Sequence, residues 1–531
     1  MNIRTLIFHR EIPAALIAFF TFVFGLAAIA ADASAETRPN VIVIISDDQG
    51  YSDLGLHNLR KDIKTPNLDQ LARSGALFTD GYVTSPQCAP SRAGLLTGRY
   101  QQRCGLDSIS ETPLPLEEQT LAERLQREGY ATGMAGKWHL SFPSTVTLAG
   151  TGTAEEKAEI PFTPGQRGFD DFFYGNWYDY WANYAPDGRS LKREGEVFKT
   201  DPSKAENYYT DVKTEAALSF IRRQDKKPFF FYLAYLAPHT PLIATKKYLD
   251  RFPGDMPQRR RAALAMISAV DEGVGRIMGL LEEKGLRDNT IIVYLSDNGA
   301  PLGANVDAPL ADIMPTTNPK GIWDGSINEP LRGEKGILSE GGIRVPFIMS
   351  WPRHVAGGTV FREPVIALDV VPTVLAASGL PKDSRLDGVN LLPYLAKSRE
   401  PMPSRDLFWR FWNQTAVRSG DWKLIVAGDY KLLFNLKDDL GETKNVIGEH
   451  ADLASSLEKK LAAWNAEMKP PGIPRNPLNE QERKMYRYHF GDPDSRISPD
   501  VPQLPDGAAD HLPETRPDGR IESSRQSLEE R

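Results

Sequence analysis

The chain has 531 residues, of which 41% are hydrophobic and 25% are charged. This composition is typical of a globular protein and excludes a disordered or collagen-like chain, and the length predicts one large domain or two to three smaller ones. A total of 63 Lys and Arg against 70 Asp and Glu gives a net charge of -7. That balance disfavours a nucleic-acid partner, because such proteins more often carry a basic excess. The two cysteines are too few for a disulfide framework, so they either pair once or one of them has a chemical role.

The first 35 residues have the features of a secretory signal peptide. Arg4 and Arg10 precede an apolar run over residues 12–31, and Ala33-Ser34-Ala35 matches a small-residue cleavage pattern. The alternative is an uncleaved membrane anchor, because an apolar run of about 20 residues can span a bilayer. We expect cleavage near Ala35 and a secreted or periplasmic protein. No stable membrane insertion is expected after cleavage, since no later segment is apolar enough to span.

Strand-like and helical segments alternate along the chain. The predicted strands cover residues 41–45, 131–135, 229–233 and 291–295, and the continuous β-branched runs among them are typical of strands buried on both faces of a parallel sheet. The predicted helices cover residues 65–75, 120–129, 209–223 and 261–283. This alternation predicts an α/β fold over residues 36–400, with a doubly wound, mainly parallel sheet flanked by helices.

Polar side chains follow each predicted strand. Asp47-Asp48 and Asp297-Asn298 follow two of them, and Lys137, His139 and His239 follow the other two. A single Asp pair after a strand is most often a helix cap or turn, and a single His there is usually a surface or capping residue. Four polar strand ends together indicate a site, because ligands bind beyond the carboxyl ends of such strands and buried carboxylates need a counter-charge.

The residue types at these strand ends suit a metal-assisted reaction on an oxyanion. Asp47, Asp48, Asp297 and Asn298 offer hard oxygen ligands, which favours Ca²⁺ or Mg²⁺ over zinc or a redox metal. The surrounding basic side chains are Lys137, His139, His239 and Lys335. A divalent cation among such groups is suited to a multiply charged oxyanion, so phosphate and sulfate esters are the natural substrates.

The segment around Cys88 allows two interpretations. Pro90 is well placed in the first turn of a helix that runs through Leu96, so the positive end of the helix would face Cys88 and any bound anion. The alternative is a disulfide between Cys88 and Cys104, which is plausible in an exported protein. The spacing alone leaves both interpretations open.

Residues 88–98, Cys-Ala-Pro-Ser-Arg-Ala-Gly-Leu-Leu-Thr-Gly, resemble the signature of the formylglycine-dependent sulfatase family. These are arylsulfatase-like and N-acetylgalactosamine-6-sulfatase-like enzymes of the alkaline-phosphatase-like superfamily. The resemblance extends to the two strand ends with Asp47 and Asp297, and to Gly-Lys-Trp-His at 136–139, Ala-Pro-His at 237–239 and Glu-Gly-Gly-Ile-Arg-Val-Pro at 340–346. It spans roughly residues 38 to 440.

The resemblance implies a cofactor and a modified residue. One Ca²⁺ per chain, with Mg²⁺ less favoured, would be held by Asp47, Asp48, Asp297, Asn298 and the modified Cys88. Cys88 would be oxidised to 3-oxoalanine (formylglycine) by a formylglycine-generating enzyme, which is therefore an expected partner. One hydroxyl of the hydrated aldehyde would attack the sulfur of the ester. Loss of a proton from the other hydroxyl, to His139, would then release sulfate.

The resemblance also implies roles for the remaining site residues. Arg92 and Lys137 would stabilise the hydrate and the metal-bound oxygen, and Lys137 would also contact substrate. His239 and Lys335 would bind the sulfate group and protonate the leaving alcohol. Cys104 would be a free, buried thiol, and Arg344 is expected to form a buried structural salt bridge.

A smaller C-terminal α+β subdomain is expected over residues 401–480. Short antiparallel strands are predicted at 406–412, 415–418, 422–426 and 430–436, and a helix at 451–468. Sulfatases have a subdomain of this kind. Residues after about Lys469 are rich in Pro, Asp and Arg and have few apolar side chains, apart from Met485-Tyr-Arg-Tyr-His-Phe490. This composition predicts an extended or disordered tail over residues 481–531.

The substrate is expected to be a sulfated polysaccharide or oligosaccharide. Residues 177–184, Trp-Tyr-Asp-Tyr-Trp-Ala-Asn-Tyr, are unusually aromatic for a predicted loop and either stack on sugar rings or anchor the loop on the core. Three alternative functions stay open: a formylglycine-dependent phosphodiesterase or phosphonate hydrolase, an inactive protein that binds sulfated glycans, and a structural exported protein with a Cys88–Cys104 disulfide.

Overall fold

The computed structural model of the protein describes residues 38–107, 113–141, 160–302, 325–396, 400–470 and 480–491. The predicted signal peptide over residues 1–35 lies outside the described residues, as do residues 492–531 of the predicted tail. The chain divides into two units at Arg38, and the fold described below belongs to the unit that begins at Pro39. Among the described residues, no helix is both long and apolar enough to cross a bilayer.

A ten-stranded sheet forms the centre of this unit, and its five middle strands are parallel. In spatial order these are β5 (Asp171–Tyr174), β4 (Ala131–Gly136), β8 (Phe229–Pro238), β1 (Asn40–Asp47) and β9 (Thr290–Ser296). All four strands predicted from the sequence lie in this parallel block, which confirms the predicted α/β class.

Antiparallel strands extend the sheet at both sides. On one side are β10 (Phe347–Ser350), β2 (Ala76–Phe78) and β11 (Thr359–Phe361), and on the other are β6 (Asp179–Ala182) and β7 (Glu196–Lys199). Of these, only the β2–β11 pair is parallel. The sheet is therefore parallel where the predicted site lies and mixed at its margins.

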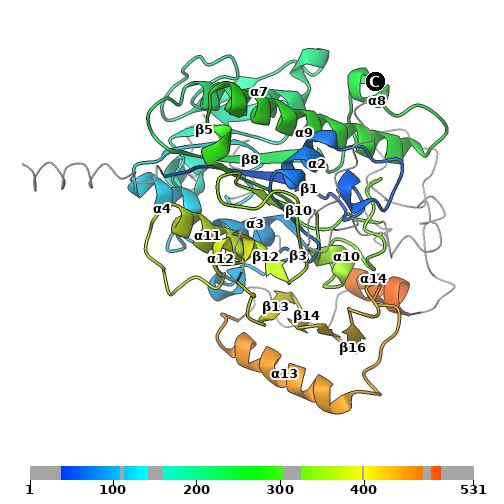
Figure 1. Cartoon of the computed structure of the whole chain (residues 1–531). Helices are drawn as coiled ribbons and strands as arrows, with labels where there is room; N and C mark the ends of the chain where they lie inside the picture. Colours follow the sequence, from blue (N-terminus) through cyan, green and yellow to red (C-terminus); the bar gives the residue numbers. More distant parts are fainter. Residues whose placement is uncertain are drawn as a thin grey trace, which may run out of the picture. The chain divides into compact units, whose positions relative to one another are not determined.

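Helices cover both faces of the sheet, as a doubly wound fold requires (Figure 1). One layer contains α2 (Pro66–Arg73), α7 (Tyr209–Arg222) and α9 (Gln258–Glu283), and the other contains α3 (Cys88–Thr97), α4 (Leu121–Arg127) and α11 (Val370–Ala377). Alternate side chains of β1 point into the two layers, because Val41, Val43 and Ile45 belong to one hydrophobic cluster and Ile42 and Ile44 to the other. Burial on both faces explains why this strand is apolar throughout.

Several short elements complete the unit. They are β3 (Gly81–Tyr82), β12 (Val365–Ile366), α8 (Lys246–Leu249), α10 (Glu340–Ile343), α12 (Leu392–Leu395) and 3-10 turns at 55–57, 101–104, 160–162, 164–166, 205–207, 287–289 and 367–369. The pair β3 and β12 forms a separate small parallel sheet.

The predicted C-terminal strands form a four-stranded antiparallel sheet. The strands are β13 (Asp406–Phe411), β14 (Gln414–Ser419), β15 (Trp422–Ala427) and β16 (Tyr430–Asn435), and α13 (Ala451–Ala466) follows them. The element types and their order are as predicted, with bounds that differ by one or two residues.

Buried ion pairs join the antiparallel sheet to α10 and to the segment between β2 and β3. Lys423 on β15 reaches Glu340 of α10 at 2.7 Å and Glu442 at 3.0 Å, and all three side chains are fully buried. Arg344 pairs with Asp80 at 3.0 Å and with Glu340 at 3.2 Å. The expectation of a buried structural salt bridge at Arg344 is therefore confirmed.

The prediction of an extended tail from residue 481 is wrong for its first ten residues. Residues Glu480–Phe490 form the helix α14, which packs on β16 through Tyr430–Tyr486 and Phe434–Phe490 ring contacts. Met485, Tyr486 and His489 are buried. Their spacing of three and four residues is a helical stripe, which the polar average composition of the region conceals.

The prediction of an aromatic loop over residues 177–184 is also wrong in part, because residues 179–182 form β6. Tyr180 and Tyr184 are fully buried, and Trp181 is half-buried against the core. Trp177 remains exposed, at 40% of its surface. These aromatics therefore anchor the strand on the core, except for Trp177.

Candidate active site

The carboxyl ends of four parallel strands meet at one edge of the sheet. Ser46 pairs in register with Ser296, Asp47 with Pro238, and Gly136 with Ala234. The polar clusters predicted to follow these strands therefore converge, because neighbouring parallel strands end side by side.

A glycine directs the chain into the site after β4. Gly136 has a φ of +102°, and a Cβ atom there would lie 1.8 Å from the carbonyl oxygen of Ala234. The close approach lets the amide of Lys137 donate to that same oxygen at 2.8 Å. Only glycine permits this geometry, which fixes where the Lys137 side chain starts.

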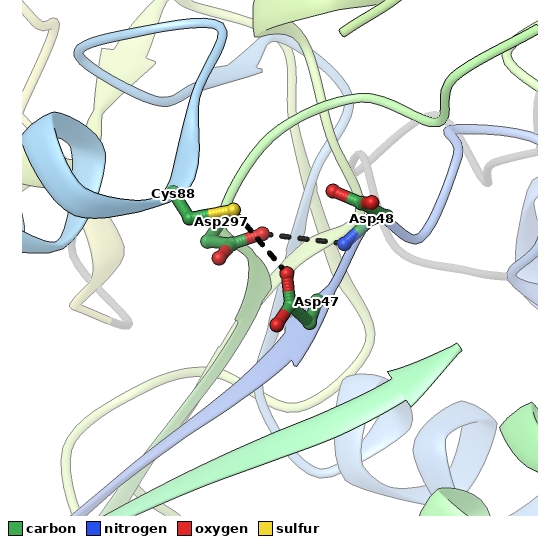
Figure 2. A group of neighbouring side chains, drawn as sticks. All are labelled: Asp47, Asp48, Cys88 and Asp297. Atoms are coloured by element: carbon green, nitrogen blue, oxygen red, sulfur yellow. Dashed lines mark hydrogen bonds between the residues drawn. The ribbon is translucent and has the colours of Figure 1, made fainter. Parts of the chain in front are cut away.

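Cys88 is the first residue of α3 and lies beside the strand ends. Pro90 occupies the first turn of this helix, as predicted, and the helix ends at Gly98. The thiol is buried and donates a hydrogen bond to Asp47 Oδ1 at 3.4 Å (Figure 2). Cys88 and Cys104 are both free cysteines, so the alternative of a disulfide between them is wrong. Cys104 is half-buried and donates to the carbonyl of Gln101 at 3.1 Å.

Three carboxylates and the thiol form a cluster that could hold a metal ion. Ligand atoms of Asp47, Asp48, Cys88 and Asp297 lie within 4.8 Å of one another, and all four side chains are buried (Figure 2). Asp48 has a φ of +66°, and its amide donates to Asp297 Oδ1 at 3.2 Å.

Asn298, the fifth predicted metal ligand, is also suited to hold a cation. Asn298 is buried, and its amide nitrogen donates to Asp48 Oδ1 at 2.6 Å. Among the described residues, nothing donates a hydrogen bond to Asn298 Oδ1. A buried acceptor without a donor is costly, and a cation beside it would satisfy it. The oxygen-rich donor set suits a hard divalent cation.

Cationic side chains surround the carboxylates. Lys137 Nζ lies 2.7 Å from Asp47 Oδ2, and Lys335 Nζ lies 2.7 and 2.8 Å from the two oxygens of Asp48. Arg92 donates to Asp297 Oδ2 from Nε at 2.9 Å and from Nη2 at 2.7 Å. The site thus combines buried negative and positive charge, as a metal-assisted oxyanion site requires.

The environment shifts the pKa of several site residues. Although burial raises the pKa of Asp47, Lys137, His239 and Arg92 together hold it well below the usual range. Burial and the neighbouring Asp47 charge raise the pKa of Asp297 to about 6. Burial and the charge of Asp297 raise the pKa of the Cys88 thiol to about 12. An unmodified Cys88 would therefore be a neutral thiol and a poor nucleophile at neutral pH.

The two histidines differ in their surroundings. Burial, with the charges of Lys137 and Arg92, lowers the pKa of His139 well below its usual value, so its ring is neutral at neutral pH. Among the described residues, His139 Nδ1 has no hydrogen-bond partner. His239 Nδ1 lies 2.5 Å from the carbonyl of Thr240, and its Nε2 faces Asp48 Oδ2 at 3.6 Å.

The structure brings the predicted site residues to one place. Ion pairs link the predicted ligands with Arg92, Lys137, His239 and Lys335, and the charge of Lys137 helps to lower the pKa of His139. Sequence reasoning missed Lys213 on α7, which is fully buried and donates to the carbonyl of Asn176 at 2.6 Å. Burial lowers the pKa of Lys213 to about 7. The charge of Asp47 opposes this shift and that of Lys137 adds to it. A lysine four residues after Tyr209, on the apolar stripe of a predicted helix, was the available signal.

Comparison with known proteins identifies the family. The sequence profile of the sulfatase family matches residues 39–380, and that of the C-terminal region of N-sulphoglucosamine sulphohydrolase matches residues 333–467. Human N-acetylgalactosamine-6-sulfatase is 33% identical over 399 residues, covering 71% of this chain and 69% of the relative. Mouse arylsulfatase J is 32% identical over 432 residues, covering 75% of this chain and 66% of the relative.

A solved structure agrees with these relatives. The crystal structure of Ps i-CgsB in complex with k-i-k-neocarrahexaose is 32% identical, with a TM-score of 0.67, and covers 85% of this chain and 97% of the other. The family profile covers well over half of the chain, across all four strand ends that form the site. The chain therefore belongs to the sulfatase family and is a sulfuric ester hydrolase.

Proposed function

We propose that this protein is an exported sulfatase that depends on Ca²⁺ and on a formylglycine made from Cys88, and that it acts on sulfated carbohydrate chains. The observation that carries the proposal is the buried cluster of Cys88, Asp47, Asp48 and Asp297 at the carboxyl ends of the strands. With its pKa raised to about 12, the unmodified thiol would be a poor nucleophile in this cluster, whereas the hydrate of a formylglycine at the same position would supply a reactive hydroxyl.

The cation and the modified residue 88 have defined places in this proposal. Asp47, Asp48, Asp297 and Asn298 would hold Ca²⁺, which would draw electron density from the oxygens of a bound sulfate group. A formylglycine at residue 88 would supply, as its hydrate, a hydroxyl nucleophile for sulfur and a second hydroxyl whose ionisation allows sulfate to leave.

The chain's own side chains hold the ester and move protons. Lys137, which is buried, and Lys335, which is half-buried, provide positive charge for the sulfate oxygens. Arg92 holds Asp297 in place through two hydrogen bonds. The neutral ring of His139 is the form that accepts a proton from residue 88. His239 Nδ1 donates to the carbonyl of Thr240, which turns Nε2 towards the site. The doubly protonated form of this ring would donate its Nε2 proton to the leaving alcohol.

Two lines support a carbohydrate substrate. A relative at 33% identity is named for N-acetylgalactosamine-6-sulfate, and the similar solved structure contains a neocarrahexaose. Trp177 lies on a turn that starts beside the site, because the amide of Gly175 donates at 3.0 Å to the carbonyl of Gly136, the residue before Lys137. An exposed tryptophan next to a sulfate site is suited to stack on a sugar ring.

Export is proposed from the sequence of residues 1–35, with its basic start, apolar run and small-residue cleavage pattern. Amino-terminal sequencing of the protein recovered from the culture medium or the periplasm would test it. A chain that starts near Glu36 is expected, and a full-length chain retained in the membrane fraction would favour the uncleaved anchor.

A sulfate-release screen tests the proposed activity. Protein produced with a formylglycine-generating enzyme should release sulfate from at least one glycosaminoglycan or algal polysaccharide. Parallel assays with a phosphodiester and a phosphonate ester would detect the alternative hydrolase, and glycan binding without turnover would reveal an inactive binding protein. Either of those results without sulfate release would refute the proposal.

A further inference from the structure

The segment that carries Lys335 is tied to the two walls of the site. The amide of Lys335 donates to the carbonyl of Ala300 at 3.2 Å, shortly after Asn298. The amide of Gly336 donates to the carbonyl of Pro86 at 3.0 Å, two residues before Cys88. The position of the Lys335 ammonium group therefore depends on how this segment is held.

Glu334 links the same segment to the C-terminal helix α14. Its Oε1 lies 2.9 Å from His489 Nε2, and its Oε2 accepts a hydrogen bond from the amide of Leu302 at 2.7 Å. The Glu334 side chain is 1% exposed and that of His489 is 7% exposed. A buried carboxylate needs its donors, because removing one of them leaves uncompensated charge in a site of low dielectric.

A second series of hydrogen bonds reaches the other side of Lys335. Gln414 Nε2 donates to the carbonyl of Gly336 at 2.9 Å, and Gln414 Oε1 accepts from the hydroxyl of Tyr486 at 2.8 Å. Both Gln414 and Tyr486 are fully buried. Helix α14 is thus linked to the residues before and after Lys335 by two separate series of hydrogen bonds, although it is about 145 residues away in sequence.

We propose that α14 belongs to the active-site scaffold and that His489 is a positioning residue that acts on Lys335 through Glu334. The inference rests on the proposed function, in which Lys335 holds the sulfate group. His489 fixes the Glu334 carboxylate, Glu334 fixes the backbone next to Lys335, and Lys335 is thereby held over Asp48 and the sulfate oxygens. Figure 1 shows α14, in red-orange, close to α10 and β16 and apart from α13, which is drawn in a lighter orange.

A double-mutant cycle tests the inference. His489→Ala is expected to lower kcat/KM for a small aryl sulfate on the order of tenfold, with most of the loss in kcat, because a misplaced cation stabilises the transition state less well. In a Lys335→Ala background the same change should cost little further activity, since the group it positions is gone. His489→Gln should recover much of the loss, because its amide can still donate to Glu334.

Two further variants protect the test. Arg487→Ala removes an exposed side chain from the same helix and should leave kcat/KM and Tm unchanged. Tyr486→Phe removes only the hydroxyl that donates to Gln414 and keeps the ring packed on Tyr430. It therefore tests the role of α14 in the active site even if His489→Ala folds poorly. We expect Tyr486→Phe also to lower kcat in the wild-type background and not in the Lys335→Ala background.

The outcomes separate a positioning role from a structural one. Equal losses in the wild-type and Lys335→Ala backgrounds, or unchanged activity in both His489→Ala and Tyr486→Phe, would overturn the inference. Calorimetric titration with inorganic sulfate gives an independent reading, and weaker binding is expected in both His489→Ala and Lys335→Ala. If the wild-type protein binds sulfate with this dependence but turns over no sulfate ester, the proposed function fails while the positioning role of His489 stands.

Discussion

Lys335 Nζ donates to both carboxylate oxygens of Asp48, at 2.7 and 2.8 Å. Burial alone would lower the pKa of this lysine, but Asp48, with Cys88 and Asp47, raises it well above its usual value. Lys335 is therefore charged at neutral pH. It is a fixed positive charge at the place proposed for the sulfate group.

Replacing Lys335 with Ala is expected to lower kcat/KM by about 10²–10³, the usual cost of removing one oxyanion donor. The loss should be similar for a small aryl sulfate and a sulfated oligosaccharide, because both present the same sulfate group. Steady-state kinetics on the two substrates would check this, with Lys246→Ala as the control, whose side chain is 86% exposed. A loss confined to the oligosaccharide would instead place Lys335 in carbohydrate recognition.

Cys88 and Cys104 provide a matched pair of free thiols. Mass spectrometry of the peptide that contains Cys88 should show the aldehyde form in protein from a competent host, while Cys104 keeps its thiol. Cys88→Ala should abolish turnover and leave the fold intact, and Cys88→Ser should do the same in hosts that do not convert serine. Cys104→Ala should retain activity. Full activity in Cys88→Ala would refute the formylglycine mechanism.

Removing the metal should reduce activity and stability together. Asp47, Asp48 and Asp297 bring three buried carboxylates within 4.8 Å, and their repulsion is greatest when no cation lies between them. Chelation is expected to abolish turnover and to lower Tm, and Ca²⁺ should restore both. Asp297→Ala should imitate chelation, whereas Asp225→Asn, at a side chain that is 78% exposed, should respond as the wild type does. A chelated enzyme at full rate would contradict the proposed metal.

Trp177 and Trp181 separate carbohydrate recognition from packing. Trp177 is 40% exposed, and its turn is held by Lys213 through Asn176 and by Tyr180, whose hydroxyl donates to the Trp177 carbonyl. Trp177→Ala should lower kcat/KM several-fold on an oligosaccharide, at about 1 kcal/mol per stacking contact, and leave a small aryl sulfate almost unaffected. Trp181→Ala, at a half-buried position, should lower Tm and affect both substrates alike. The opposite result for Trp177 would show that it only packs on the core.

The buried triad of Glu340, Lys423 and Glu442 predicts a pH-dependent stability. Burial raises the pKa of Glu442 to about 7. Lys423 opposes this shift only in part, because its single charge is shared with Glu340, which Arg344 also holds in its charged form. A carboxyl group whose pKa is higher in the folded than in the unfolded state makes its full contribution to stability at pH values below its unfolded-state pKa. This contribution is lost as the pH rises from that pKa towards the folded-state pKa of about 7.

Glu442→Gln should therefore gain stability relative to the wild type as the pH increases from 5 to 8. The gain should reach on the order of 1–3 kcal/mol and level off above pH 7 to 8. Thermal melts across this range would measure it, with Glu283→Gln at an exposed position as the control. A difference in Tm that does not change with pH would show that Glu442 keeps one charge state throughout.

Much of the site could be predicted because its residues are local in sequence. Asp47 is the last residue of one buried strand and Asp297 directly follows another, and the Cys88 segment carries a contiguous motif at the start of a helix. The two wrong predictions have a common cause. Both segments were predicted from their composition alone. Residues 179–182 form a strand because they pair with β5, and residues 480–490 form a helix that packs on β16.

The sequence by itself determined the fold class, the order of the strands and helices and the residue types of the site, because strand ends, caps and periodic apolar faces are encoded over short stretches. Only the tertiary structure decided which distant groups share a charge or a hydrogen bond. Glu442 with Lys423, Lys213 with the turn at Asn176, and His489 with Glu334 are contacts of this kind. Each pairs a buried polar group with a partner outside its own helix, strand or loop, and burial of such a group is stable only once packing has brought its partner to it.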